Sequence, residues 1–283
     1  MVEMNGKDLR NELLVSLKDK IAKLPVQLGL AVIQIGNDEA SNVYVRQKEK
    51  LANELGYKFI HKIFKDSIKQ ETVINYIKKL NKDDSIDGIL VQMPLPKHLD
   101  SSIIQNTIDS YKDVDGLTFI NAGRLVQNMP SLIPCTPKGI INLLDKYKIP
   151  IEGSQVVVIG RSVLVGKPIA NLLTNRNASV TICHSKTKNI EIYTKNADIV
   201  IVAVGKAKYL KKEMIKPGAI VIDVGINRIN GKLYGDVDYE NVAKIAGYIT
   251  PVPGGVGPMT VYELMHNVYS AHYLREKYVK NKK

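Results

Sequence analysis

The chain has 283 residues, of which 45% are hydrophobic and 24% are charged. This composition is typical of globular proteins, and the length is sufficient for two α/β domains. No apolar run is long enough to predict a transmembrane helix, and the first residues lack the apolar core of a signal peptide. The two cysteines, Cys135 and Cys183, form no metal-ligand pattern. We therefore expect a cytoplasmic protein without disulfides, bound metal or membrane contact.

The formal net charge is +12, which raises the question of nucleic-acid binding. Lys outnumbers Arg 33 to 7, Trp is absent, and the lysines are scattered along the chain. Proteins that read nucleic acids rely on Arg for bidentate contacts and on exposed aromatic rings for stacking. We therefore expect no nucleic-acid partner, and the surplus of Lys favours anionic small molecules. A lysine-rich binding protein is the alternative outside enzymes.

The N-terminal part of the sequence alternates between helical and strand patterns. Apolar residues first recur at helical spacing, and a continuous apolar run typical of a buried strand follows them. The patterns predict helices at 7–23, 41–55 and around 73–80, and strands at 28–35, 57–64 and 88–92. Because helices alternate with strands, we expect a small parallel sheet.

The second predicted helix carries Tyr44 and Lys48, which are four residues apart and therefore share one face. Short-chain dehydrogenases use a Tyr-x-x-x-Lys pair, but theirs follows an N-terminal glycine turn. Here the pair precedes the glycine turn at 160–166, and this order favours a separate substrate domain. A chance pair on a solvated, charged helix is the alternative.

Gln92 closes the predicted strand 88–92, which Pro94 and Pro96 prevent from continuing. In open parallel sheets, ligands bind outside the carboxyl ends of the strands. Gln92 is therefore either a residue of a site or only the end of a strand. The acidic turn at 112–116 is also ambiguous, because such turns are most often solvated or bonded to their own backbone.

A strand, a glycine turn and a helix start follow one another at 156–168. Four β-branched residues precede Gly160, Gly166 follows after five residues, and Pro168 suits the first turn of a helix. Backbone amides and a helix N-terminus in this arrangement can hold a phosphate. The spacing differs from the Gly-x-Gly-x-x-Gly of the usual dinucleotide motif, so a turn without a ligand is the alternative.

The rest of this half is typical of a Rossmann unit. The patterns predict a helix at 135–147 and strands at 156–159, 179–183, 198–204, 219–224 and 246–250. A dense Gly/Pro stretch at 250–260 leads into a helix predicted at 261–276. Since glycines admit close approach of a ligand and prolines stiffen a loop, we expect this stretch to face a ligand.

The end of the second Rossmann strand indicates which nicotinamide cofactor binds. NAD-specific units usually carry an Asp or Glu there, which bonds the adenosine 2′-hydroxyl. This chain has Ser185 and Lys186 at that place, with Arg161 available from the glycine turn. Because cations and hydroxyls bind a 2′-phosphate that a carboxylate would repel, we expect NADP rather than NAD.

Seven segments resemble, in order, the bifunctional methylenetetrahydrofolate dehydrogenase/methenyltetrahydrofolate cyclohydrolase family. The segments are 41–48, 88–96, 112–118, 134–137, 160–168, 183–187 and 251–260. Each is unspecific alone, but seven in the family's order over nearly the whole length are specific.

The resemblance implies a two-domain α/β protein. An N-terminal three-layer α/β folate domain is expected at 1–118, a Rossmann NADP-binding domain at 119–261, and a C-terminal helix at 262–283 that returns to the first domain. The resemblance also implies a folate site in the cleft between the domains, and homodimers paired through the Rossmann domain. The expected ligands are NADP and tetrahydrofolate derivatives, polyglutamylated forms among them.

The resemblance also implies roles for individual residues. The match to Lys48 is the acid/base residue, Gln92 orients it, and Tyr44 packs against the folate. Asp115 matches the residue that holds the pterin, and Asp113 is expected to tolerate replacement. The other implied contacts are Gly255 and Pro258 with substrate, and Gly160, Arg161, Ser162, Gly166, Ser185 and Thr136 with cofactor.

Two alternatives among enzymes stay open at this point. One is another two-domain NAD(P)-dependent dehydrogenase of amino or hydroxy acids, which would not need Lys48, Gln92 and Asp115 together. The other is a folate dehydrogenase without the cyclohydrolase activity. The expected function is oxidation of 5,10-methylenetetrahydrofolate with NADP, followed by hydrolysis of the methenyl product to 10-formyltetrahydrofolate.

Overall fold

The computed structural model describes residues 1–278 and divides the chain into two compact units. Unit 1 comprises Met1–Leu14 and Pro134–Glu263, and unit 2 comprises Val15–Ile133 with the described part of Leu264–Lys283. Both units are α/β, as predicted, and the chain passes between them within helix α1 (Gly6–Ala22), before Pro134, and within helix α10 (Val256–Tyr278). The last five residues of the predicted C-terminal helix lie outside the described residues.

The bounds of the units differ from the predicted 1–118 and 119–261. The first residues belong to unit 1 because strand β1 (Val2–Glu3) pairs in parallel with strand β11 (Tyr248–Ile249). Residues 119–133 belong to unit 2 and include helix α5 (Phe119–Val126), whose Asn121 donates to the backbone carbonyl of Ser110 over 2.8 Å.

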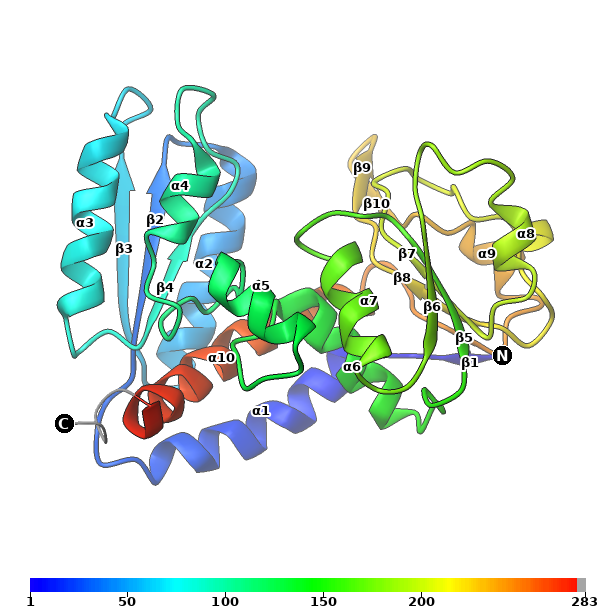
Figure 1. The fold of residues 1–283 in the computed structure, drawn as a ribbon, viewed down its shortest axis with the longest axis horizontal. Helices are drawn as coiled ribbons and strands as arrows, with labels where there is room; N and C mark the ends of the chain where they lie inside the picture. Colours follow the sequence, from blue (N-terminus) through cyan, green and yellow to red (C-terminus); the bar gives the residue numbers. More distant parts are fainter. Residues whose placement is uncertain (279–283) are drawn as a thin grey trace. The chain divides into compact units, whose positions relative to one another are not determined.

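Unit 2 contains a parallel three-stranded sheet in the order β3-β2-β4. The strands are β2 (Gly29–Ile35), β3 (Lys58–Phe64) and β4 (Gly88–Val91). All seven residues of β2 are buried, as expected for a central strand. Apolar residues of helix α3 (Gln70–Lys82) and helix α4 (Ser101–Asn106) pack on one face of the sheet, while helix α2 (Glu39–Glu54) lies across the sheet from α3 (Figure 1). These are the three predicted layers.

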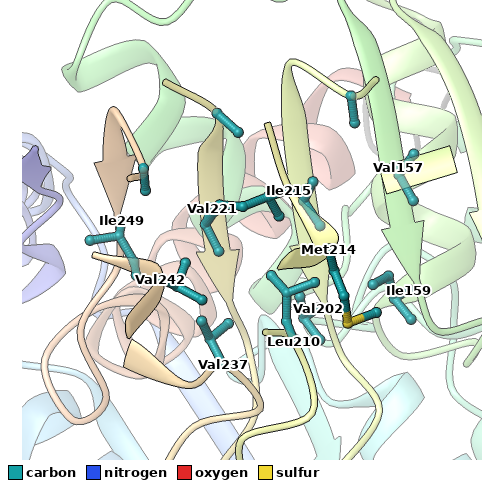
Figure 2. Close-up of a cluster of buried hydrophobic side chains, with 14 of the residues drawn as sticks. Val157, Ile159, Val202, Leu210, Met214, Ile215, Val221, Val237, Val242 and Ile249 are labelled. Atoms are coloured by element: carbon teal, nitrogen blue, oxygen red, sulfur yellow. The ribbon is translucent and has the colours of Figure 1, made fainter. Parts of the chain in front are cut away.

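Unit 1 contains a parallel six-stranded sheet in the order β1-β11-β8-β7-β5-β6. Its other strands are β5 (Gln155–Ile159), β6 (Ser179–Cys183), β7 (Ile199–Val202) and β8 (Ile220–Asp223). The chain moves from β5 to β6 on one side and then returns to β7 on the other, so the strand order reverses between β5 and β7. This is the doubly wound arrangement that the patterns predict. Figure 2 shows the apolar core on one face of this sheet.

Four α-helices, a 3-10 helix (Lys212–Met214) and one hairpin also lie within unit 1. The helices are α6 (Cys135–Lys146), α7 (Gly166–Thr174), α8 (Glu191–Thr194) and α9 (Tyr239–Val242). The hairpin pairs β9 (Asn227–Ile229) with β10 (Lys232–Tyr234), and positive φ angles at Asn230 and Gly231 form its turn. Among the described residues, no helix is long and apolar enough to cross a membrane.

Helix α10 begins at Val256, earlier than the predicted 261. The sequence reads as a loop there because of its glycines and Pro258. In the structure, Pro258 is the third residue of the helix, where a missing N–H breaks no intrahelical hydrogen bond. The Gly/Pro loop therefore ends at Gly255.

Candidate active site

A lysine and a glutamine from different elements meet at the carboxyl end of the unit 2 sheet. The Lys48 Nζ donates a 2.8 Å hydrogen bond to the Gln92 Oε1. Lys48 is on α2, which follows β2, and Gln92 comes directly after β4, the neighbour of β2 in the sheet. Both side chains are partly accessible to solvent. The contact places an amine at the sheet edge where ligands of parallel sheets bind.

Gln92 is itself oriented by the backbone. Its Nε2 donates to the carbonyl oxygen of Met93 over 2.8 Å, so its oxygen must be the atom that faces Lys48. The hydroxyl of Ser41 donates to the same carbonyl over 3.4 Å. Ser41 is held in turn at the start of α2, where its backbone N–H donates to the Asp38 carboxylate over 2.8 Å. These bonds link the helix that carries Lys48 to the segment that carries Gln92.

A buried polar network beneath this pair is not visible in the sequence patterns. Gln34 in β2 is only 2% exposed, and its Nε2 donates to Asn42 Oδ1 in the first turn of α2 over 2.8 Å. The Gln34 Oε1 lies 3.0 Å from the ring Nε2 of His61 in β3. Burial lowers the pKa of His61, which favours a neutral imidazole. The network ties the start of α2 to two strands and could be found only in three dimensions.

Tyr44 lies one helical turn before Lys48 and is 44% exposed. Its ring is therefore free to contact a ligand that reaches the amine from the same face of α2. Val45, the residue after Tyr44, is only 1% exposed and anchors α2 in the protein interior. The orientation of Tyr44 and Lys48 is therefore set by packing of α2 on the sheet.

Asp115 lies beside the same sheet edge. Residues 112–113 run parallel to β4, with Asp113 opposite Ile89 and the carbonyl of Lys112 accepting from the N–H of Ile89 over 2.7 Å. Asp115 is two residues further along this direction, toward the end of β4 that carries Gln92. The half-buried Asp115 carboxylate therefore belongs to the same carboxyl edge as the Lys48–Gln92 pair.

The neighbouring Asp113 does not behave as expected from the sequence. Its carboxylate is fully buried and accepts hydrogen bonds from the side chains of Gln105 and Asn121, at 3.1 and 3.0 Å, and from the N–H of Thr118 at 2.8 Å. Burial raises the pKa of Asp113. These bonds argue against the expectation that Asp113 tolerates replacement, because its loss would leave buried donors without an acceptor.

The glycine turn of unit 1 lies where the strand order reverses. A Cβ added to Gly160 would be 2.4 Å from the carbonyl oxygen of Ala203, and one added to Gly166 would be 2.1 Å from that of Gly160. Only glycine permits this packing of the turn against β7. The Ser162 Oγ accepts from the N–H of Val165 at 3.1 Å and of Gly166 at 3.4 Å. A helix N-terminus thus faces the crevice where doubly wound sheets bind nucleotides.

Two cationic or hydroxyl side chains that could bind a 2′-phosphate are exposed in this unit. Arg161 follows the end of β5, and Ser185 follows the end of β6, which is the strand paired with β5. The turn after β6 is closed by a 2.9 Å hydrogen bond from the N–H of His184 to Thr187 Oγ1. No carboxylate occurs in that turn, as the sequence indicates.

The remaining predicted residues gather at the start of α10 and α6, also in unit 1. Gly255 is packed so tightly that an added Cβ would be 2.6 Å from the carbonyl oxygen of Pro251. Pro258 lies in the first turn of α10. The Thr136 Oγ1 in α6 is 2.9 Å from the Thr260 Oγ1 in α10. The structure thus groups Lys48, Tyr44, Gln92 and Asp115 in unit 2, and the other predicted site residues in unit 1.

No cluster of His, Cys, Asp and Glu that could hold a metal ion occurs within residues 1–278. The model of the catalytic domain of tetrahydrofolate dehydrogenase/cyclohydrolase matches residues 4–115, and the model of its NAD(P)-binding domain matches residues 134–276. The chain belongs to the tetrahydrofolate dehydrogenase/cyclohydrolase family. In chain order, the family's two domain models thus cover the three-stranded sheet of unit 2 and, in unit 1, strands β5 to β11.

Members of the tetrahydrofolate dehydrogenase/cyclohydrolase family match the chain over almost its whole length. The bifunctional protein FolD of Vesicomyosocius okutanii is 51% identical over 275 residues, which cover 96% of this chain and 99% of that protein. The FolD structure from Campylobacter jejuni is 45% identical, with a TM-score of 0.95 and coverage of 97% and 99%. The Trypanosoma brucei enzyme, solved with NADP cofactor and inhibitor, is 34% identical, with a TM-score of 0.92 and 99% coverage of both chains.

Proposed function

We propose that this chain oxidises 5,10-methylenetetrahydrofolate to the methenyl compound with NADP and hydrolyses that compound to 10-formyltetrahydrofolate. Family membership and the bifunctional relatives support both reactions. The observation that carries the proposal is the contact between Lys48 and Gln92, which holds an amine at the ligand edge of the catalytic domain. A dehydrogenase without hydrolytic activity would have no need for an amine held in this way.

The oxidation requires alignment rather than a base. NADP supplies the acceptor for the hydride that leaves the methylene carbon between N5 and N10 of the folate. The residues that fit NADP are those of the glycine turn, where Gly160 and Gly166 leave no room for side chains and let the backbone approach a ligand closely. Arg161, Ser162 and Ser185 would hold the 2′-phosphate, and Thr136 would contact the cofactor.

The hydrolysis requires transfer of protons. Water adds its oxygen to the methenyl carbon, the bond from this carbon to N5 breaks, and of the two water protons one goes to N5 and one to solvent. A cationic substrate beside Lys48 favours its neutral amine by charge repulsion, and this amine can accept a proton from the attacking water and return it to N5. Gln92 keeps the Lys48 nitrogen in place during both transfers.

The folate would be held by polar and by apolar contacts. A carboxylate at Asp115 can accept two N–H bonds from the amidine-like edge of the pterin, and the exposed ring of Tyr44 offers a face for packing. Gly255 and Pro258 would contribute backbone and ring contacts. The substrates include polyglutamylated tetrahydrofolates, whose carboxylates suit the positive charge of the chain. We expect the enzyme to act in the cytoplasm, without nucleic-acid or membrane partners.

A homodimer through unit 1 is part of the proposal. Strand β6 is at the edge of the six-stranded sheet, and Ile182 on it is 38% exposed. Ser179 and Thr181 of the same strand line a hollow of about 360 Å³ together with the exposed Ile192 and Tyr193 of α8. An exposed edge strand next to apolar side chains is a surface that proteins normally cover. A second copy of the chain would cover it.

The proposal is tested by mixing purified protein with methylenetetrahydrofolate and NADP and following the methenyl absorbance, then following its decay on isolated methenyltetrahydrofolate. We expect both activities. Absence of turnover on both substrates would contradict the proposal. For the dimer, light scattering of Ile182→Lys should show a monomer, whereas Ile103→Lys, an exposed residue of unit 2, should leave the mass unchanged. A monomeric wild-type protein would contradict the dimer.

A further inference from the structure

Two buried carboxylates in unit 1 have no role in the site described above. Asp223 is the last residue of β8 and is 2% exposed, and Asp236 follows the hairpin β9–β10 and is fully buried. Neither has a Lys or Arg salt-bridge partner among the described residues. Buried carboxylates without a cation normally require a full set of hydrogen-bond donors.

Asp236 accepts hydrogen bonds at all of its available sites. The Oδ2 accepts from the backbone N–H of Val204 at 2.7 Å and of Gly205 at 2.8 Å. The Oδ1 accepts from the N–H of Lys206 at 2.8 Å and from the Nδ2 of Asn227 at 2.9 Å. Three successive amides of one loop are therefore fixed by a single side chain.

This loop lies next to the glycine turn. Residues 203–206 come directly after β7, and the carbonyl oxygen of Ala203 is the atom that a Cβ on Gly160 would meet at 2.4 Å. The strand order reverses between β5 and β7, so the loop and the glycine turn form the two sides of the crevice where a doubly wound sheet binds its nucleotide. Gly205 and Lys206 are exposed there.

Asp223 holds the backbone on which Asp236 lies. Its carboxylate accepts from the N–H groups of Gly225, Asp236 and Val237, at 3.0, 2.8 and 2.9 Å. A Cβ on Gly235 would come within 1.8 Å of the Asp223 carboxylate, so only glycine fits before Asp236. The bonds connect the ends of β8 and β7 through the two carboxylates.

The pair is costly for folding. Burial, with a smaller contribution from the charge of Asp236, raises the pKa of Asp223 to about 6. The neighbouring Asp236 carboxylate therefore adds to the effect of burial in opposing ionisation of Asp223. Uncharged hydrogen-bonding side chains would hold the same backbone at a lower cost in folding free energy. Proteins commonly accept such a cost where a functional surface must be rigid.

We propose that Asp236 is a positioning residue for NADP, acting through the loop 204–206 that forms one side of the nucleotide crevice. This inference rests on the proposed function and deepens it. Asp236 does not touch the cofactor but holds three backbone amides in the conformation that the cofactor meets. Without this acceptor, the loop would sample other conformations and the affinity for NADP would fall, while the Lys48–Gln92 pair in unit 2, on which hydrolysis depends, would be unaffected.

The test uses the full-length protein with Asp236→Asn, which removes one charge and leaves one acceptor oxygen. The matched control is Asp198→Asn, whose carboxylate accepts from the N–H of Gln155 at 2.8 Å, at the opposite, amino end of the sheet. We measure the Kd of NADP by calorimetry, KM and kcat of the dehydrogenase for NADP, and methenyl hydrolysis without NADP. Asp236→Asn should raise Kd and KM about tenfold or more, with kcat recovered at saturating NADP.

Hydrolysis by Asp236→Asn should stay within about twofold of the wild type, and Asp198→Asn should leave the KM for NADP unchanged. Parallel loss of both activities, or an unchanged KM in Asp236→Asn, would overturn the proposal. If Asp236→Asn does not fold, Asn227→Ala removes one donor only and should raise the KM two- to fivefold, about 0.4–1 kcal/mol. An unchanged KM there would also overturn it. Failure of the proposed function itself would appear in the wild type, before any variant is made.

Discussion

The Nζ of Lys48 and the Oε1 of Gln92 lie 2.8 Å apart, although one residue is on a helix and the other follows a strand later in the chain. The Gln92 amide cannot rotate to offer its nitrogen, because that nitrogen donates to the carbonyl of Met93. Lys48 therefore faces a fixed acceptor, which accepts a hydrogen bond from the ammonium form and from the neutral amine. The lysine can change its protonation state without losing its position.

The first prediction concerns the amine itself. Lys48→Met keeps most of the side-chain length but removes the group that transfers protons. We expect hydrolysis of methenyltetrahydrofolate to fall by roughly 10²–10⁴-fold, with a smaller loss of dehydrogenase activity. Lys48→Arg should not restore hydrolysis, because guanidinium does not release its proton near neutral pH. Both half-reactions are measured on the same folate. Normal hydrolysis by Lys48→Met would exclude a catalytic role.

The second prediction separates the two aspartates of the turn. Asp115→Ala should raise the folate KM of both activities, by about ten- to a hundredfold for loss of one charged hydrogen-bond partner, with little change in melting temperature. Asp113→Ala should instead lower the free energy of unfolding by about 3 kcal/mol or more, since buried donors of Gln105, Thr118 and Asn121 lose their acceptor. Thermal melting and kinetics of each variant decide between the roles. Equal melting temperatures for the two variants would contradict this assignment.

The third prediction concerns cofactor choice. Arg161→Ala removes an exposed cation at the end of β5 that would contact only the 2′-phosphate. We expect the KM for NADP to rise about tenfold or more and the KM for NAD to change little, so that the preference for NADP narrows. Steady-state kinetics with both cofactors provide the measurement. An equal loss with both would show that Arg161 has another function.

The fourth prediction is a dependence of stability on pH. Lys112 is 2% exposed and donates to the carbonyls of Leu80 and Asp83 at the end of α3, at 2.9 and 2.7 Å. Burial, together with nearby Arg275, lowers its pKa to about 8. Between this pKa and that of an unfolded lysine, the unfolded chain holds more protons, so the contribution of Lys112 to stability rises with pH above about 8.

Lys112→Met removes this titration. The free energy of unfolding of the wild type minus that of the variant should therefore become more positive by roughly 1–2 kcal/mol from pH 7 to pH 9.5. Denaturant unfolding of both proteins at the two pH values provides the measurement. A difference that stays constant, or that shrinks, would show that Lys112 does not titrate in this range.

Much of the fold is predictable because its signals are local. The strand at 179–183 has the predicted bounds, and the alternation of helices and strands predicts both parallel sheets. Helix α5 is missed because it has only eight residues and its only boundary signal is the N-cap residue Thr118. The start of α10 is missed because Pro258 looks like a loop residue, although a first helical turn accepts it.

The site is less predictable, because its decisive contacts join distant parts of the chain. From the sequence alone, Lys48 can be a lysine on a solvated helix and Gln92 only the end of a strand. Only the family resemblance links the two residues. Asp113 reads as a solvated turn residue because the side chains that bury it, Gln105 and Asn121, lie on two separate helices. Asp236 carries no signal in the sequence, since three of its four donors are backbone amides of another segment.

The pairing of β1 with β11 has a consequence for biosynthesis. Val2 and Glu3 leave the ribosome long before Tyr248 and Ile249, the residues whose backbone they pair with. Met4 is fully buried, so these first residues have no permanent place until the end of the unit 1 sheet has been made. Unit 2 likewise includes residues after Glu263. Each unit is closed by chain made later, so native contacts in unit 1 become complete only after Ile249 has been made, and those in unit 2 only after Leu264 has been made.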